Sequence, residues 1–122
     1  MNTRIFTPIL LATMFSACGM REKVEQAHSE AFEMLADQSF KTSVAVIELY
    51  KVRYGVYPPS LDSITYTSAF DDNAFTSVKY ERLDTGYRLD LADGFMGKQK
   101  SEIAYPAEFW QGTGVKQSNL LK

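Results

Sequence analysis

The amino-terminal segment constrains folding more than any other feature, because it has the three parts of a secretory signal. Arg4 supplies a positive charge, residues 5–15 form an apolar run, and small residues at 16 and 17 precede a cleavage point. The run is shorter than the about 20 apolar residues that a membrane-spanning helix needs, and it contains Pro8. We therefore expect residues 1–17 to be a signal peptide that takes no part in the final fold.

The only cysteine, Cys18, follows this segment directly. The stretch Phe15-Ser16-Ala17-Cys18 resembles the lipobox of bacterial lipoproteins, with Phe15 where Leu is usual. The resemblance implies that Cys18 becomes the first mature residue and carries fatty acyl chains such as palmitate, which anchor the protein to a membrane of the cell envelope. Gly19, where Asp would signal inner-membrane retention, implies the outer membrane, facing the periplasm. Inner-membrane retention and an ordinary signal peptide cut elsewhere stay open.

The predicted mature chain has 105 residues, which is enough for one domain. It carries 15 acidic and 12 basic residues, and the basic ones form no block. This charge pattern argues against a nucleic-acid partner, because such binding relies on clustered Lys and Arg. With Cys18 committed to lipid, no disulfide can form within the chain.

A long helix is predicted from about Arg21 to Tyr54. Apolar residues recur there at spacings of three and four in two successive patterns, first at Val24, Ala27, Ala31 and Leu35, then at Phe40, Val44 and Ile47. Such a helix would be on the order of 50 Å long, more than one small domain can cover. We expect its first half to project as a stalk or to pair with something. Gly55 then provides a C-cap, and residues 57–60, Tyr-Pro-Pro-Ser, favour extended backbone.

The clearest strand pattern is an antiparallel hairpin over residues 77–92 with a turn at Asp84-Thr85-Gly86. Pairing Tyr80 with Leu89 and Val78 with Leu91 keeps one face apolar. The same register sets Lys79 opposite Asp90 and Glu81 opposite Arg88, so we predict this register.

The remaining segments give weaker patterns. Residues 61–75 indicate an irregular connection with one helical turn. Residues 101–110 are predicted to form a third strand at a sheet edge, since Pro106 interrupts it. The tail after Trp110 is rich in turn residues, and we expect poor order near Lys122.

Residues 47–61, Ile-Glu-Leu-Tyr-Lys-Val-Arg-Tyr-Gly-Val-Tyr-Pro-Pro-Ser-Leu, resemble the helix end of type II secretion pseudopilins and type IV pilins, most closely the major pseudopilin. The resemblance implies an α+β fold, with a long amino-terminal helix packed on a small antiparallel sheet. That pseudopilin also binds calcium. The only candidate ligands here are Asp90, Asp93 and Glu102, for which the resemblance gives no residue-by-residue alignment with its site. We predict no metal or cofactor, and a calcium ion near Asp90 and Asp93 stays an open alternative.

The chain departs from this family at its amino-terminus. Pilins carry a prepilin-peptidase site followed by about 20 apolar residues with a buried glutamate. Here Cys18 and the polar residues 20–38 stand in that place. The resemblance thus implies a pilin-like domain on a lipid anchor, not a fibre subunit. We expect a signal peptide at 1–17, an anchor with a projecting helix at 18–38, and the pilin-like domain at 39–122.

No residue pattern indicates catalysis. Asp84-Thr85-Gly86 resembles the aspartic-protease signature, but Tyr87 follows where Ala or Ser is expected, so a hairpin turn explains it. His28 is the only histidine, too few nitrogen ligands for a zinc site and without a recognisable triad. Phosphate-loop, HExxH and GxSxG motifs are absent from the sequence.

Aromatic residues divide into two predicted groups. Tyr54, Tyr57, Tyr80 and Tyr87 are expected to pack where the helix meets the sheet. The others lie in predicted loops or at an edge, where they either complete the core or anchor a partner: Phe70, Phe75, Phe95, Phe109 and Trp110.

These observations predict a lipid-anchored, non-enzymatic binding or scaffold protein with an envelope protein as partner, in the setting of secretion or pilus machinery. One alternative is a structural envelope lipoprotein that self-associates through residues 20–38. The other is a hydrolase with a carboxylate-based site. The oligomeric state is left undetermined by the sequence.

Overall fold

A computed structural model describes residues 3–92 and 103–121. Side chains are described at 23–24 and, within those ranges, from Glu30 onward. The chain divides into two compact units, Met1–Phe32 and Glu33–Lys122, and the second contains the sheet and the core.

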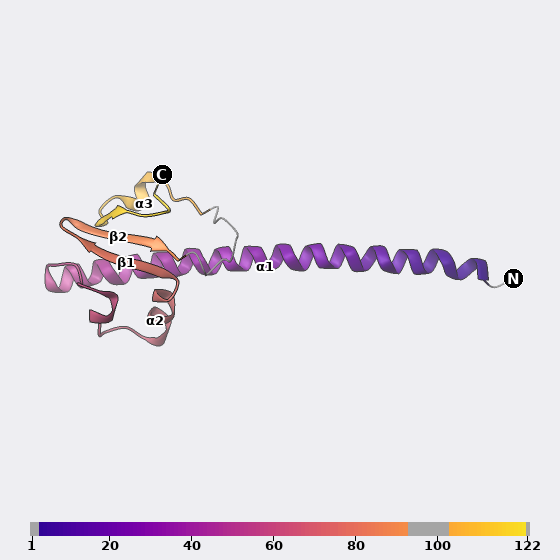
Figure 1. Cartoon of the computed structure of the whole chain (residues 1–122), viewed down its shortest axis with the longest axis horizontal. Helices are drawn as coiled ribbons and strands as arrows, with labels where there is room; N and C mark the ends of the chain where they lie inside the picture. The colour runs from indigo at the N-terminus through magenta and orange to yellow at the C-terminus, as the bar shows by residue number, and fades with distance from the viewer. Residues whose placement is uncertain (1–2, 93–102, 122) are drawn as a thin grey trace. The chain divides into compact units, whose positions relative to one another are not determined.

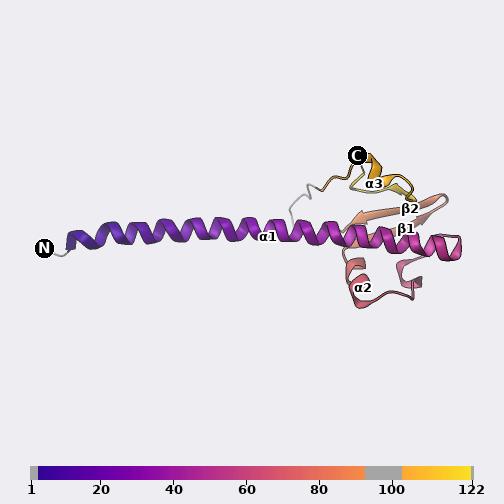
Figure 2. The ribbon, with the colours of Figure 1, turned by 180° about the vertical axis from the view of Figure 1, so that it is seen from behind.

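One helix, α1, spans Thr3–Tyr54 (Figures 1 and 2). Its predicted end is confirmed, because Gly55 takes φ +78° and its N–H donates to the Lys51 carbonyl at 2.8 Å. Its start was predicted near Arg21. The helix instead includes the apolar run at 5–15, whose Ile, Leu, Ala and Met residues are compatible with helix. The projection of residues 18–38 stays a prediction.

The predicted hairpin forms with the predicted register. Strand β1 (Val78–Leu83) pairs antiparallel with β2 (Gly86–Leu91), and Tyr80 lies opposite Leu89. Asp84 and Thr85 make the turn between them. The expected opposite positions of Lys79 and Asp90 are also confirmed. The described ion pair of Asp90, however, is with Arg88 on its own strand, at 2.8 Å.

The third strand was wrongly predicted. Residues 103–106 have no regular structure, and a short helix, α3, spans Ala107–Trp110. Proline 106 stands at the N-cap of this turn, where extended backbone with φ −64° suits it. Strand β3 is instead Val115–Gln117 and pairs parallel with β2, so the three-stranded sheet is mixed in the order β1-β2-β3. Residues 101 and 102 lie outside the described residues.

The carboxyl-terminal residues 118–121 make defined contacts with the sheet, and Lys122, near which poor order was predicted, lies outside the described residues. The Asn119 side chain bonds the backbone of Leu91 twice, accepting from its N–H at 2.9 Å and donating to its carbonyl at 2.8 Å. Leu120 is buried in the core. These contacts fasten residues 118–121 beside the end of β2.

The connection between α1 and the sheet contains more helix than predicted. A 3-10 turn, η1, spans Leu61–Ser63, and helix α2 spans Ala69–Phe75. Helix α2 begins with a capping box. The Ser68 side chain accepts a hydrogen bond from the Asp71 backbone N–H, and the Asp71 side chain accepts one from the Ser68 backbone N–H.

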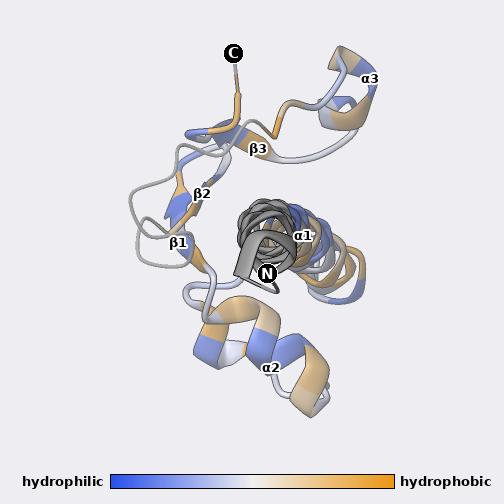
Figure 3. Cartoon of the chain, turned by 90° about the vertical axis from the view of Figure 1, so that its right-hand side faces the viewer, coloured by the Kyte–Doolittle hydropathy of each residue, from blue (hydrophilic) through white to orange (hydrophobic). Residues whose placement is uncertain are grey.

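The core lies between α1 and the sheet, which confirms the predicted α+β class. Figure 3 shows the sheet and α2 around one side of the helix. The principal core residues come from α1, the three strands and the tail: Ala36, Phe40, Val44, Ile47, Val78, Tyr87, Leu89, Leu91, Val115 and Leu120. The second compact unit begins at Glu33; within it Ala36 is fully buried and Asp37 accepts a hydrogen bond from Tyr105 at 2.7 Å. The predicted domain bounds, 18–38 and 39–122, stay a prediction.

Candidate functional site

A carboxylate on α1 collects hydrogen bonds from three parts of the chain. Glu48 accepts from the Tyr57 hydroxyl at 3.0 Å, the Tyr87 hydroxyl at 3.0 Å and the Gly114 N–H at 2.7 Å. We call these four residues the Glu48 cluster. The cluster joins the carboxyl-terminal part of α1 to the loop after it, to β2 and to the residue before β3. It therefore fixes where the sheet lies along the helix.

Glycine is required at position 114 of this cluster. A Cβ there would overlap the hydroxyl and the adjacent ring carbon of Tyr57. The backbone N–H can approach the Glu48 carboxylate while Tyr57 also reaches it, because no side chain stands between them.

The tyrosines around Glu48 hold their protons tightly. Burial, followed by the nearby Glu48 carboxylate, raises the pKa of Tyr87 well above its usual value. Burial and the hydrogen bond to Glu48 raise the pKa of Tyr57 to about 12. Burial is also the largest cause that raises the pKa of Tyr80 to about 12. The phenols of Tyr57 and Tyr87 thus stay protonated at neutral pH and can donate to Glu48.

Three of the four tyrosines expected between helix and sheet lie there. Tyr57 and Tyr80 pack on Tyr87 with ring centroids 4.9 and 5.5 Å away, and the Tyr80 hydroxyl donates to the Pro58 carbonyl at 2.6 Å. Tyr54 was wrongly placed in this group. It is exposed, and its ring packs on that of Tyr50 with centroids 4.5 Å apart.

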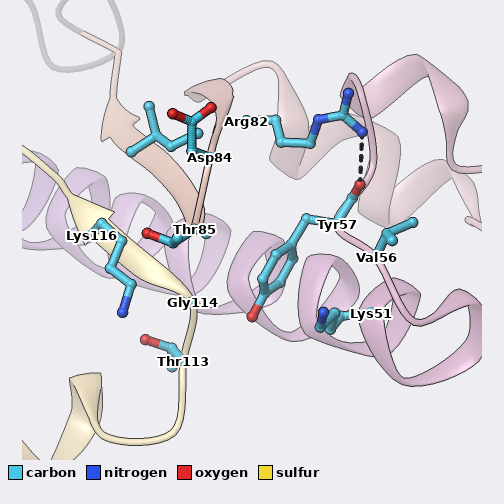
Figure 4. Close-up of a pocket in the computed structure, with 11 residues that line it drawn as sticks. Lys51, Val56, Tyr57, Arg82, Asp84, Thr85, Thr113, Gly114 and Lys116 are labelled. Atoms are coloured by element: carbon cyan, nitrogen blue, oxygen red, sulfur yellow. Dashed lines mark hydrogen bonds between the residues drawn. The ribbon is translucent and has the colours of Figure 1, made fainter.

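Next to the Glu48 cluster lies an open pocket of about 600 Å³ at the end of the hairpin (Figure 4). Its lining includes three cations from three elements, Lys51 of α1, Arg82 of β1 and Lys116 of β3. Asp84 is its one carboxylate, and Thr85 adds a hydroxyl at the hairpin turn. We call this the cationic pocket.

The predicted aromatic anchors mostly complete the core. Phe109 and Trp110 pack against it beside Phe40, whose ring centroid lies 5.8 Å from that of Tyr105 and 6.0 Å from that of Trp110. Phe75 is also packed on the core, and Phe95 lies outside the described residues.

Phe70 differs from the other predicted anchors. It is 89% exposed and borders a groove of about 310 Å³ between α1 and α2. Its side chain is therefore available to anchor a partner, which was one of the two roles predicted for these aromatic residues.

The other residues singled out in the sequence show no site. Cys18 and His28 lie on α1, but their side chains are not among those described. Asp93 and Glu102 lie outside the described residues. Asp90 bonds Arg88 and the Asn119 N–H. Across the described residues, no group of three or more His, Cys, Asp or Glu side chains could hold a metal ion.

A further surface was missed by the sequence analysis. Four apolar residues of α1 point away from the core: Met34, Ala45, Leu49 and Val52, which we call the apolar row. Val52 is 80% and Met34 71% exposed. In Figure 3 the sheet, α2 and α3 lie around α1 but leave its right-hand side without a described element over it. The helical pattern used for prediction does not separate this row from the core residues, since α1 carries apolar residues on both sides.

None of the described helices has the length and apolarity to cross a membrane. Searches among protein-family models, curated proteins and solved structures found no match to this chain.

Proposed function

We propose that this chain is a lipid-anchored, non-enzymatic binding or scaffold protein of the cell envelope. The apolar row on α1 contacts a protein partner, and Cys18 carries the anchor. The single observation that carries the binding role is the exposure of this row on a helix whose other side is already packed.

The apolar row is unusual for a helix at the surface of a domain. Such a helix normally presents polar residues to water opposite its buried stripe. Residues 45, 49 and 52 follow one another at spacings of four and three, so they lie on one face, and all three are exposed. Contiguous exposed apolar surface on a folded domain is typical of interaction sites.

The use of Glu48 supports a non-enzymatic role. Both of its carboxylate oxygens accept hydrogen bonds from groups that hold the fold together. A carboxylate engaged in this way positions secondary structure and is poorly placed to exchange protons with a substrate.

The resemblances support the location and the setting. The lipobox-like Phe15-Ser16-Ala17-Cys18 supports a lipid anchor, with the outer membrane as the proposed site. A helix that ends at Gly55 and packs on a small sheet is what a pilin-like domain would need. We therefore place the partner among the proteins of secretion or pilus machinery.

The anchor predicts a definite mass. The protein purified from membranes is expected to be heavier than the polypeptide beginning at Cys18, by the mass of its acyl groups. A Cys18→Ser variant is expected to lack this addition. Intact mass spectrometry of both proteins decides, and a native protein without acyl groups would refute the anchor while leaving the apolar row untouched.

The partner surface predicts the effect of charge on crosslinking. Leu49→Glu combined with Val52→Glu is expected to lower the yield of crosslinked partner in intact envelopes about tenfold or more, since burying two carboxylates would cost several kcal/mol. Lys79→Glu is the matched control, because it changes the net charge by the same amount on the exposed outer side of β1.

The same experiment separates a partner from self-association. A crosslinked product with twice the mass of the chain would favour self-association. Its loss in the double variant would assign the contact to the row, whereas its persistence would favour the predicted alternative, association through residues 20–38. Equal crosslinking by the double variant and by Lys79→Glu would contradict a role for the row.

A further inference from the structure

We propose that the free edge of β1 pairs with the same edge of a second copy of this chain, so that the two sheets join into one. This inference goes beyond the proposed function, since it concerns the sheet and not the apolar row. It rests on the unpaired backbone groups along β1 and on the order of charges in Lys79-Tyr80-Glu81.

The pairing of the hairpin determines which residues of β1 face this free edge. The Ala92 N–H donates to the Ser77 carbonyl at 2.8 Å, and hydrogen-bonded pairs alternate along an antiparallel ladder. Every second residue after Ser77 therefore bonds β2. Tyr87, which lies opposite Arg82, accordingly donates its N–H to the Gly114 carbonyl on the other side of β2, at 2.9 Å. The residues of β1 that direct their backbone groups to the free edge are Val78, Tyr80 and Arg82.

The backbone groups of this edge have no hydrogen-bond partner among the described residues. Strand β1 pairs only with β2 within the described sheet, and Figure 3 shows it at the end of the sheet away from β3. Backbone N–H and C=O groups that are buried without a partner are rare, so these unpaired groups face water. Another strand can replace that water by adding its own backbone to the edge.

The two charged residues on the outer side of β1 also lack partners. Lys79 and Glu81 are exposed and form no ion pair within the described residues. Their cross-strand neighbours on β2 are Asp90 and Arg88. Those two residues pair with each other along β2 at 2.8 Å, which leaves both charges of β1 available to a further strand.

One register between two β1 strands satisfies these charges. When the strands pair antiparallel about a two-fold axis at Tyr80, Lys79 of each copy lies opposite Glu81 of the other. All the edge residues then pair, which gives about six new hydrogen bonds. The two adjacent registers that use the same edge residues set Lys79 opposite Lys79, or Glu81 opposite Glu81. Unlike charges in such positions stabilise a sheet and like charges destabilise it, so the register centred on Tyr80 is favoured.

Charged residues on an edge strand usually prevent pairing between molecules. In β1, however, one residue of each sign flanks the central Tyr80, so antiparallel pairing brings unlike charges together. The strand is complementary to itself, which is what a two-fold interface between identical subunits requires. The observations therefore favour a second copy of this chain as the occupant of the edge.

Two charge-reversing variants test the register. The full chain in a non-ionic detergent is followed by sedimentation velocity from about 10 µM to about 1 mM. Lys79→Glu and Glu81→Lys are each expected to weaken self-association about tenfold, because both attractive pairs become repulsive. An equal mixture of the two variants is expected to regain the wild-type association, because one copy then carries two negative and the other two positive residues at facing positions.

The mixture is the decisive arm, since a variant that only loosened its own hairpin would not be rescued by the other. Amide hydrogen exchange of the wild-type chain places the contact. Exchange at Tyr80 and Arg82 is expected to slow as the concentration rises, whereas exchange at Glu81, which already bonds β2, is expected to stay the same.

The proposal is overturned if the chain stays monomeric at the highest concentration, if the mixture associates no better than the separate variants, or if exchange at Tyr80 and Arg82 does not depend on concentration. In the envelope crosslinking experiment, a dimer joined at β1 persists in the Leu49→Glu and Val52→Glu double variant and is lost in Lys79→Glu. A dimer joined through residues 20–38 persists in both. The failure of this proposal and that of the apolar row are therefore distinguishable.

Discussion

Replacing Glu48 with alanine is expected to lower the free energy of unfolding by about 3–5 kcal/mol. The change leaves the hydroxyls of Tyr57 and Tyr87 and the N–H of Gly114 without their acceptor. Each unsatisfied buried polar group costs about 1–3 kcal/mol, and the Tyr57 hydroxyl, which is only partly buried, is expected to contribute least. A domain of this size is stable by only about 5–15 kcal/mol, so the variant would be close to unfolding. Urea denaturation followed by Trp110 fluorescence measures the change.

The control for this prediction removes the donors as well. In the Glu48→Ala background, Tyr57→Phe together with Tyr87→Phe is expected to recover part of the loss, because the unpaired hydroxyls are gone. Full additivity of the three changes would contradict the cluster, since independent sites add and coupled sites do not.

Replacing Phe40 with alanine is expected to cost about 3–5 kcal/mol of unfolding free energy. Phe40 is fully buried on α1, and its ring packs against Tyr105 and Trp110. The variant would leave a cavity below the segment that carries α3. Because Trp110 is the only tryptophan, its emission in the folded state should also shift toward that of an exposed indole.

Phe70→Ala provides the comparison for Phe40→Ala. The same chemical change at a side chain that is 89% exposed is expected to alter stability by no more than about 0.5 kcal/mol. Equal losses in the two variants would mean that the packing of Phe40 against the sheet and α3 is not what stabilises the unit.

The parts of the fold that could be predicted are determined by residues close together in the sequence. The hairpin was predicted with its register because apolar and polar residues alternate on both sides of Asp84-Thr85, and only one pairing keeps them on separate faces. The end of α1 was predictable for a similar reason, since Gly55 and Pro58 both act on their nearest neighbours.

Strand β3 could not be predicted in this way. It has three residues, and its place depends on the Gly114 carbonyl accepting from Tyr87 and on Asn119 bonding Leu91. These contacts join residues more than 25 positions apart, and no local pattern reports them. Residues 101–110, which precede β3, have a composition more typical of a strand than β3 itself, but Pro106 is the N-cap of a helical turn there.

The Glu48 cluster had one sequence signal that was not used. Glu48 follows Ile47 and lies four residues after Val44, which places a carboxylate beside the core-facing stripe of the helix. A carboxylate in that position needs donors, and the nearby tyrosines were the available ones. The cationic pocket had no such signal, because its three cations are scattered along the chain at positions 51, 82 and 116.

The partners of Glu48 lie 9, 39 and 66 residues further along the chain. During synthesis from the amino-terminus, this carboxylate is made early and meets its last donor only when Gly114 has left the ribosome. Contacts of such wide sequence separation form slowly, since a long loop must close first. The Glu48 cluster is therefore completed only after Gly114 has been translated.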